Sequence, residues 1–154
     1  MDDAKLTEYV EKFQSTVFRT AYSYTKNTSD SEDITQDVFL KLYSEKKTFA
    51  SEENVKAWLI RVTINTSKNY LTSFWYKHKS SLPENMTLRE KSDYNLLEVL
   101  NRLSKNYRIV IYLYYYEGYS VSEISSILKI SESNVKARLK RGRDKLKAFL
   151  TDDM

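Results

Sequence analysis

Helix-breaking residues are scarce along this chain: its 154 residues include two glycines and one proline. Proteins built from β-hairpins need many tight turns, and those turns depend on such residues. Long stretches without them favour helices, because glycine and proline carry the largest penalties in a helix interior. With 41% hydrophobic residues, the chain also has enough apolar side chains to bury a core. The sequence therefore predicts an all-α fold.

Apolar side chains in the first half recur every three or four residues, the spacing of one helix face. The first such stripe consists of Leu6, Tyr9, Val10, Phe13, Val17, Ala21 and Tyr24. A polar break at residues 27–30 offers N-caps for a second helix, in which Ile34 and Val38 share a face. After a polar loop at residues 44–54, we expect a third helix at residues 54–74.

This periodicity is lost over residues 75–93, which contain Pro83. We therefore expect two small helical domains, at residues 1–75 and 94–154. A flexible linker at residues 76–93 would join them, and its length permits the two domains to separate.

The second half begins with helices expected at residues 94–103 and 106–116. Ile109 and Leu113 belong to the apolar face of the second of these helices. Gly118 then stands where a C-cap glycine ends a helix.

The following segment has the outline of a helix-turn-helix. Ser120 and Glu123 form a capping box that opens a short helix. Lys129 occupies the turn, where glycine is favoured and a left-handed lysine costs about 1 kcal/mol. Ser131 then caps a basic helix expected at residues 132–149.

Positive charge is concentrated in two blocks of the chain. Residues 54–79 carry five basic and no acidic side chains, and residues 129–147 carry eight basic and two acidic ones. Two basic blocks suit two contact points on a polyanion such as nucleic acid. Basic surface helices that bind no nucleic acid have the same composition, so the charge alone leaves both interpretations open.

Several classes of function lack the residues they need. The chain has no cysteine, so disulfides, zinc ribbons and thiol nucleophiles are excluded. Its single histidine, His78, lies in a polar stretch, and a lone exposed histidine is usually just solvated. We therefore expect no catalytic site, metal, cofactor or small-molecule substrate. The start of the chain lacks the layout of a signal peptide, and no apolar run is long enough to span a membrane. The sequence predicts a cytoplasmic protein.

Helical-wheel geometry divides the last helix into two faces. One face is an expected buried seam made of Val135, Leu139, Gly142 and Leu146. The exposed side combines small residues, which let the backbone approach the DNA major groove, with amide and basic side chains that contact base edges and phosphates. The predicted DNA-reading residues are Ser133, Asn134, Lys136, Ala137, Lys140 and Arg141. Arg138 and Arg143 lie nearer the seam, where they would hold phosphates or support the domain.

Four collinear segments resemble motifs of the sigma-70 family. Residues 31–39 (SEDITQDVF) and 58–65 (WLIRVTIN) are similar to D-A-E-D-I-T-Q-E-V-F and W-L-x-R-I-A-x-N. Residues 117–124 (EGYSVSEI) and 135–143 (VKARLKRGR) are similar to E-G-x-S-x-x-E-I-A and V-K-x-R-L-x-R-A-R. The length and two-part layout resemble the extracytoplasmic-function subgroup. The resemblance implies a sigma factor that brings RNA polymerase core to particular promoters.

In that subgroup, the resemblance implies, the second helix docks on the clamp helices of the largest polymerase subunit. An acidic, amide-bearing face suits a basic protein surface and not DNA. The matching positions are Asp33, Gln36, Asp37 and Phe39. For Phe39, packing in the hydrophobic core is the alternative to a polymerase contact.

The loop and third helix match the segment that recognises the promoter −10 element, so residues 1–75 correspond to sigma region 2 and residues 94–154 to region 4, which recognises the −35 element. Melted single strands bind to cationic grooves with aromatic or apolar pockets for bases. The predicted −10 residues are Lys46, Lys47, Phe49, Asn54, Lys56, Arg61, Asn65 and Lys68. Trp75 and Tyr76 are further aromatic candidates, and Trp58 is expected in the core.

Two departures from the family pattern stand out. Asn69 and Thr72 replace the common Asp and Arg of the third helix, which removes an expected salt bridge and a DNA contact. Ser104 replaces the proline that usually opens the region 4 helix. The family implies an anti-sigma partner, which could hold the protein at the membrane. The alternatives are a stand-alone helix-turn-helix regulator, a structural helical adaptor and an enzyme.

Overall fold

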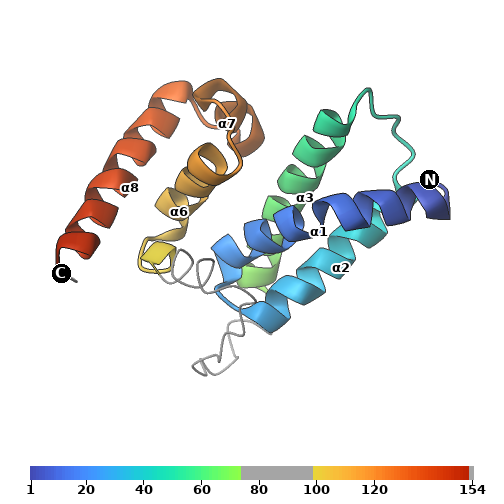
Figure 1. The fold of residues 1–154 in the computed structure, drawn as a ribbon, viewed down its shortest axis with the longest axis horizontal. Helices are drawn as coiled ribbons and strands as arrows, with labels where there is room; N and C mark the ends of the chain where they lie inside the picture. Colours follow the sequence, from blue (N-terminus) through green and yellow to red (C-terminus); the bar gives the residue numbers. More distant parts are fainter. Residues whose placement is uncertain (74–98, 153–154) are drawn as a thin grey trace. The chain divides into compact units, whose positions relative to one another are not determined.

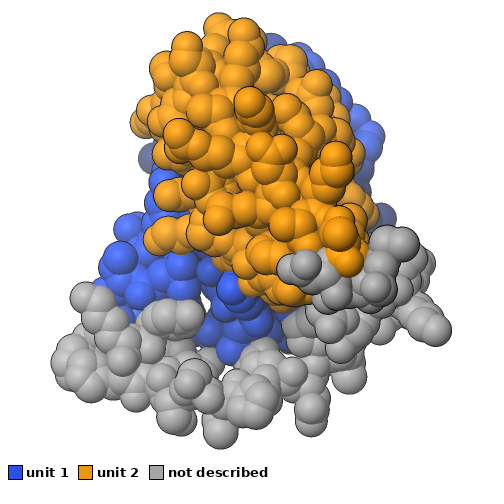
Figure 2. Space-filling model, turned by 90° about the vertical axis from the view of Figure 1, so that its left-hand side faces the viewer, with its two compact units in different colours: residues 1–86 blue, residues 87–154 orange. Residues whose placement is uncertain are grey.

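The computed structural model describes residues 1–73 and 99–152. Every element in these ranges is helical, and the chain divides into two compact units, residues 1–86 and residues 87–154 (Figures 1 and 2). This confirms the predicted all-α class. The proposed linker at residues 76–93 lies outside the described residues, as do the candidates Trp75, Tyr76 and His78.

Three helices build the first unit: α1 (Asp3–Thr25), α2 (Thr28–Ser44) and α3 (Glu52–Thr72). Each of them packs against the other two. Their first turns are capped by Asp2, Asn27 and Ser51, whose side chains accept hydrogen bonds from backbone N–H groups. Because Ser51 supplies the cap, α3 begins two residues before the expected position.

The core of this unit contains most of the predicted stripe of α1. It consists of Tyr9, Phe13, Val17, Ala21, Ile34, Val38, Phe39, Leu42, Val55 and Leu59. These side chains come from all three helices, so burying them removes apolar surface from water along the whole length of the unit.

The second unit contains α6 (Lys105–Ile111), the π-helical turn η1 (Tyr112–Tyr116), α7 (Val121–Leu128) and α8 (Glu132–Asp152). The helix expected at residues 106–116 thus widens into a π-turn after Ile111. The described part of the helix expected at residues 94–103 is helical only at residues 99–100, and a turn then leads into α6.

Backbone geometry confirms the predicted helix-turn-helix at α7 and α8. Ser120 and Glu123 form the reciprocal capping box, and Gly118 is left-handed at φ +77°. Lys129 ends α7 in the left-handed region at φ 57°. The Ser131 hydroxyl accepts the Asn134 N–H at 3.0 Å and caps α8. The lysine in the turn therefore adopts the conformation that glycine would otherwise provide.

Candidate nucleic-acid and protein interfaces

The outer face of α2 is acidic. Asp33, Gln36 and Asp37 are all exposed and lie one helical turn apart on one side of the helix. Asp37 forms a 3.2 Å ion pair with Lys41, whose ammonium also donates to the Thr66 hydroxyl of α3 at 3.0 Å. This face therefore presents two exposed carboxylates and one amide, and the Asp37 carboxylate is paired with Lys41.

Phe39 does not belong to this face. It is 7% exposed and is part of the core that joins the three helices. Its side chain therefore takes the core position that the sequence left as the alternative, and a polymerase contact by Phe39 stays a prediction. The physical reason is its position on the wheel: Phe39 is about 100° from Val38, which is fully buried, and both residues turn inward.

Leu40 is the residue that sequence reasoning missed on this face. Its side chain is 66% exposed, the largest fraction among the exposed large hydrophobic residues of the described chain. Leu40 follows Gln36 by four residues and Asp37 by three, so it lies on the same side of α2. This spacing was the available signal, and it places one apolar side chain within the acidic face.

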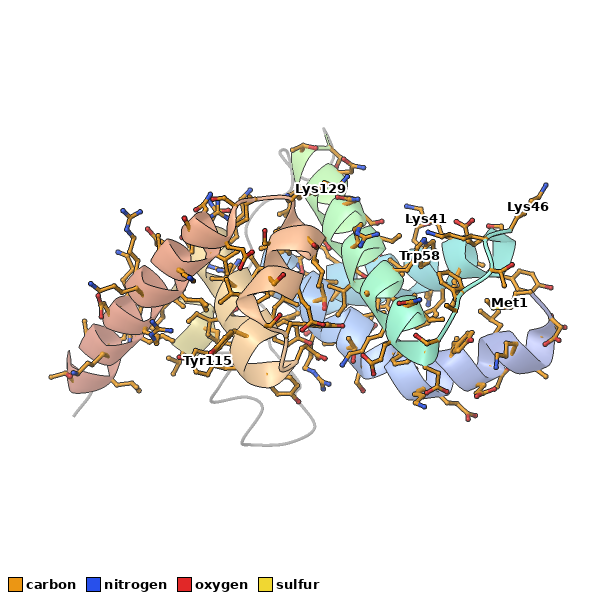
Figure 3. The ribbon with its side chains drawn as sticks, turned by 90° about the horizontal axis from the view of Figure 1, so that it is seen from above. Met1, Lys41, Lys46, Trp58, Tyr115 and Lys129 are labelled. Carbon is orange, nitrogen blue, oxygen red and sulfur yellow. The ribbon has the colours of Figure 1, made fainter. Side chains whose placement is uncertain are left out.

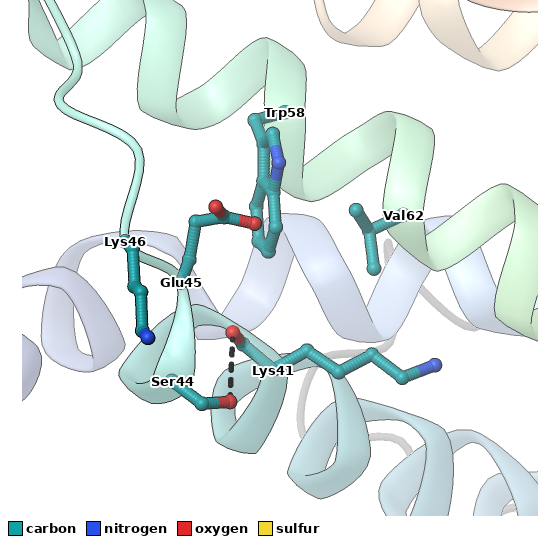
Figure 4. A pocket seen from close by; sticks show the side chains of 6 residues that line it. All are labelled: Lys41, Ser44, Glu45, Lys46, Trp58 and Val62. Atoms are coloured by element: carbon teal, nitrogen blue, oxygen red, sulfur yellow. Dashed lines mark hydrogen bonds between the residues drawn. The ribbon is translucent and has the colours of Figure 1, made fainter.

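An open hollow of about 480 Å³ lies between the end of α2, the loop of residues 45–51 and α3. Figure 4 shows Trp58 and Val62 on α3 facing the loop side, where Lys46 is placed, and in Figure 3 Lys46 projects outward from the loop. The lining residues are Lys41, Ser44, Glu45, Lys46, Trp58 and Val62.

Aromatic side chains support the wall of this hollow. Phe49 is half-buried and contacts Trp58 edge to face, with ring centroids 5.8 Å apart at 73°. Trp58 was expected in the core. Its side chain packs against the core but also lines the hollow, so it is only partly buried. Lys47 of the loop is exposed, and its backbone N–H donates to the Glu45 carboxylate at 3.0 Å. The loop thus combines two cations with an apolar, aromatic floor.

The predicted residues on α3 divide into two sets. Asn54, Arg61, Asn65 and Lys68 fall within about 60° of one another on the helix, on the side that also carries Trp58. Lys56 lies about 200° from Asn54 and points toward the core-facing side. The structure therefore separates Lys56 from the stripe, because residues two apart take opposite sides of a helix.

The two predicted faces of α8 are borne out by burial. Val135 and Leu139 are 0% and 3% exposed, and Gly142 is buried so tightly that an added Cβ would lie 3.0 Å from Cγ1 of Ile111. Leu146 is half-buried. The other face is open, with only Ala137 half-buried among the predicted DNA-reading residues Ser133, Asn134, Lys136, Ala137, Lys140 and Arg141.

Two arginines of α8 bind neighbouring side chains. The Arg138 Nε donates to the Asn134 amide oxygen at 3.1 Å, so one hydrogen-bonding group predicted to read bases is engaged within the helix. Arg143 donates to the Tyr115 hydroxyl at 3.2 Å and joins α8 to η1. In Figure 3, Lys129 marks the turn that precedes α8 and Tyr115 lies on η1.

Among residues 1–73 and 99–152, no group of three His, Cys, Asp or Glu side chains is arranged to hold a metal ion. In the same ranges, no helix is both long enough and apolar enough to cross a membrane.

Comparison with known proteins matches each of the two units to a protein-family model. The family model for sigma-70 region 2 matches residues 9–75, and the model for sigma-70 region 4 matches residues 94–146. The ECF RNA polymerase sigma factor SigM of Bacillus subtilis is 31% identical, over 94% of this chain and 94% of its own length. RNA polymerase sigma factor SigV of the same organism is 27% identical, over 96% and 90%.

Solved structures share the fold. The sigma factor RpoE of Bartonella quintana, solved with the anti-sigma factor NepR, has a TM-score of 0.80 at 20% identity, covering 97% of this chain and 99% of its own. CnrH, solved with the cytosolic domain of CnrY, has a TM-score of 0.73 at 24% identity, covering 99% and 92%. At these identities the likeness concerns the fold alone.

The matches to sigma-70 region 2 and region 4, in this order along one chain, define a protein of transcription initiation. The chain belongs to the sigma-70 family of RNA polymerase sigma factors, in its extracytoplasmic-function group. It is a sigma factor that works with RNA polymerase core and promoter DNA in promoter-specific initiation. The alternative of a stand-alone regulator leaves the region 2 match without a role.

Proposed function

We propose that the three surfaces divide promoter recognition among them. The outer face of α2 binds polymerase core, the hollow and stripe beside α3 hold melted −10 bases, and the open face of α8 reads the −35 duplex. The observation that carries this division is the separation of charge: the acidic face lies on α2, whereas the exposed loop lysines and the open face of α8 are cationic. Each surface has the sign that its partner requires.

The α2 surface consists of Asp33, Gln36, Asp37 and Leu40. Carboxylates repel DNA phosphates, so this face suits a basic protein partner, and the partner proposed is the pair of clamp helices of the largest polymerase subunit. Leu40 adds an apolar contact that excludes water from the centre of such an interface.

The −10 surface consists of the hollow with Lys46, Lys47, Phe49 and the stripe on α3. Unstacked bases are held by aromatic contact and by cations that follow the backbone, and the hollow offers both. The stripe residues are Asn54, Arg61, Asn65 and Lys68. Trp58 enters this surface as a lining residue.

The −35 surface is the open face of α8. Lys136, Lys140 and Arg141 supply cations, while Ser133 and Ala137 keep the helix close to the groove floor. Binding through two linked units multiplies modest affinities when the connection spans both sites.

The proposed role is binding, without a catalytic step, in the cytoplasm where polymerase core is found. We also propose an anti-sigma partner, since RpoE and CnrH, which share this fold, were solved with such a protein and with a cytosolic domain. A membrane-bound anti-sigma partner would hold the protein at the membrane.

In vitro transcription with purified core polymerase tests the proposal. Substitution of Lys140 and Arg141 by Ala should lower −35-dependent transcription and leave core binding intact. Asp37→Ala should weaken core binding and leave −35 recognition by the helix-turn-helix unit unchanged. Equal loss of core binding in both variants would show that this division of roles is wrong. Absence of promoter-specific initiation by the unaltered protein would overturn the proposal as a whole.

A further inference from the structure

Two side-chain contacts join α1 to the two ends of the loop of residues 45–51. Tyr43, one residue before the end of α2, donates from its hydroxyl to Oδ1 of Asp3 at 2.9 Å. Glu52, the first residue of α3, forms a hydrogen-bonded ion pair with Lys12. Each contact spans 40 residues of sequence. The N-terminal half of α1 therefore touches both flanks of the loop.

The middle of the same loop is held from another direction. Phe49 packs edge to face on Trp58 of α3, and both rings rest against the core. The loop is thus anchored at its two ends by polar contacts to α1 and at its centre by an aromatic contact to α3. Lys46 and Lys47 lie between the first anchor and the centre.

We propose that Asp3 and Lys12 of α1, with their partners Tyr43 and Glu52, are positioning residues for the loop that captures −10 bases. This inference rests on the proposed −10 role of the loop. It adds a helix remote in sequence to the determinants of base preference, because the two contacts hold the flanks of the loop that carries Lys46 and Lys47.

The contacting side chains are exposed to solvent, so they affect the position of the loop more than the folding stability of the protein. The Lys12 and Glu52 side chains are 49% and 45% exposed, and exposed ion pairs contribute little to folding. A binding site nevertheless depends on holding its groups within about 0.5 Å of the productive geometry. Contacts at the two ends of a short loop limit the positions that its residues can take. They do so with little effect on the free energy of unfolding.

The chain offers a matched control on the same helix. Lys5 and Glu8 form an exposed ion pair at 3.6 Å, with side chains 50% and 53% exposed, and both residues lie within α1. Reversing Lys5 alone changes the charge by the same amount as reversing Lys12, within an ion pair that stays on α1. Glu8 is left unchanged because its carboxylate also interacts with the Lys12 ammonium.

The experiment uses the full chain and charge reversal. The variants are Lys12→Glu, Glu52→Lys and their double variant, with Lys5→Glu as the control. Tyr43→Phe removes the other anchor without a charge change. Hydrogen exchange of the backbone amides in residues 45–51 reports the loop directly. Selection from premelted templates with a randomised non-template strand, bound by reconstituted holoenzyme, reports base preference.

Each single reversal should speed loop exchange about two- to fivefold, the range expected for one exposed pair, and should flatten base preference. The double variant should restore both, and the Lys5→Glu control should change neither. Unchanged loop exchange in Lys12→Glu and Tyr43→Phe would overturn the positioning role and leave the −10 proposal standing. Faster exchange with unchanged base preference would overturn the inference because the −10 role of the loop itself is wrong.

Discussion

The Tyr70 hydroxyl donates a 2.8 Å hydrogen bond to Oδ1 of Asp30, which joins the last turn of α3 to the first turn of α2. Asp30 is 1% exposed, so this carboxyl is satisfied inside the protein. Asn69 and Thr72 stand where related proteins commonly carry an Asp and an Arg, and the sequence predicts a missing salt bridge there. The link from Tyr70 shows that the end of α3 is tied to α2 by a different residue.

Tyr70→Phe should lower the free energy of unfolding by about 2 kcal/mol, because the buried Asp30 carboxyl loses a hydrogen bond. Urea unfolding followed by circular dichroism measures this change. Tyr114→Phe, which removes a hydroxyl from a residue 38% exposed in the other unit, should have little effect. Equal effects of the two variants would show that the Tyr70 contact adds no stability.

Leu40→Asn should weaken the binding of polymerase core about tenfold, because it removes an apolar group that the interface would bury. Fluorescence anisotropy of the labelled protein, titrated with core, measures the affinity. Leu150→Asn is the matched control, since Leu150 is 52% exposed but lies on α8. A weaker effect at Leu40 than at Leu150 would remove Leu40 from the docking surface.

Lys140→Ala and Arg141→Ala should each reduce the salt dependence of holoenzyme binding to −35 duplex DNA. A phosphate contact releases about one counterion, so the slope of log affinity against log salt should fall by about 1 per variant. Titrations at several salt concentrations measure the slope. Lys5→Ala on α1 serves as the control, and a slope change of the same size there would argue against a specific role for α8.

Lys129→Gly should stabilise the second unit by about 0.5–1 kcal/mol. Lys129 has φ 57°, where a side chain is strained and glycine is not, although glycine also gains entropy in the unfolded chain. Lys26, which ends α1 at φ 56°, allows the same substitution in the first unit. Thermal unfolding of both variants checks the expectation, and destabilisation in both would contradict it.

Alkaline pH should weaken both contacts between α1 and the residues that flank the loop. The hydrogen bond to Asp3 raises the pKa of Tyr43 above 10.0, and the hydrogen bond with Glu52 raises the pKa of Lys12 above 10.5. A folded-state pKa above the unfolded value means that each contact stabilises fully below about pH 10 and loses its contribution as pH rises through the folded pKa. Asp3→Asn should return the pKa of Tyr43 toward 10.0, as measured by carbon NMR of labelled tyrosine.

Features that depend on a single helix were predictable from the sequence. The capping box of Ser120 and Glu123, the Ser131 cap and the α8 seam through Val135 and Leu139 all follow from spacings of three or four residues. These rules need no information about neighbouring helices. The same is true of the acidic exposure of Asp33 and the predicted face of α8.

Features that depend on contacts between helices were not predictable in this way. The hollow beside Trp58 exists because the loop, α2 and α3 meet there, and the contacts of Asp3 and Lys12 join residues 40 positions apart. Lys56 was grouped with the −10 residues by motif, and the orientation of α3 against the core turns it to the other side.

Phe39 and Leu40 show what can and what cannot be predicted from the sequence alone. The sequence determined that both are apolar residues of an amphipathic helix next to an acidic stripe, because periodicity and composition are properties of the chain. Only the tertiary structure decided that Phe39 is 7% exposed and Leu40 is 66% exposed. The physical reason is that burial requires a second surface, and α1 and α3 supply that surface on one side of α2 only.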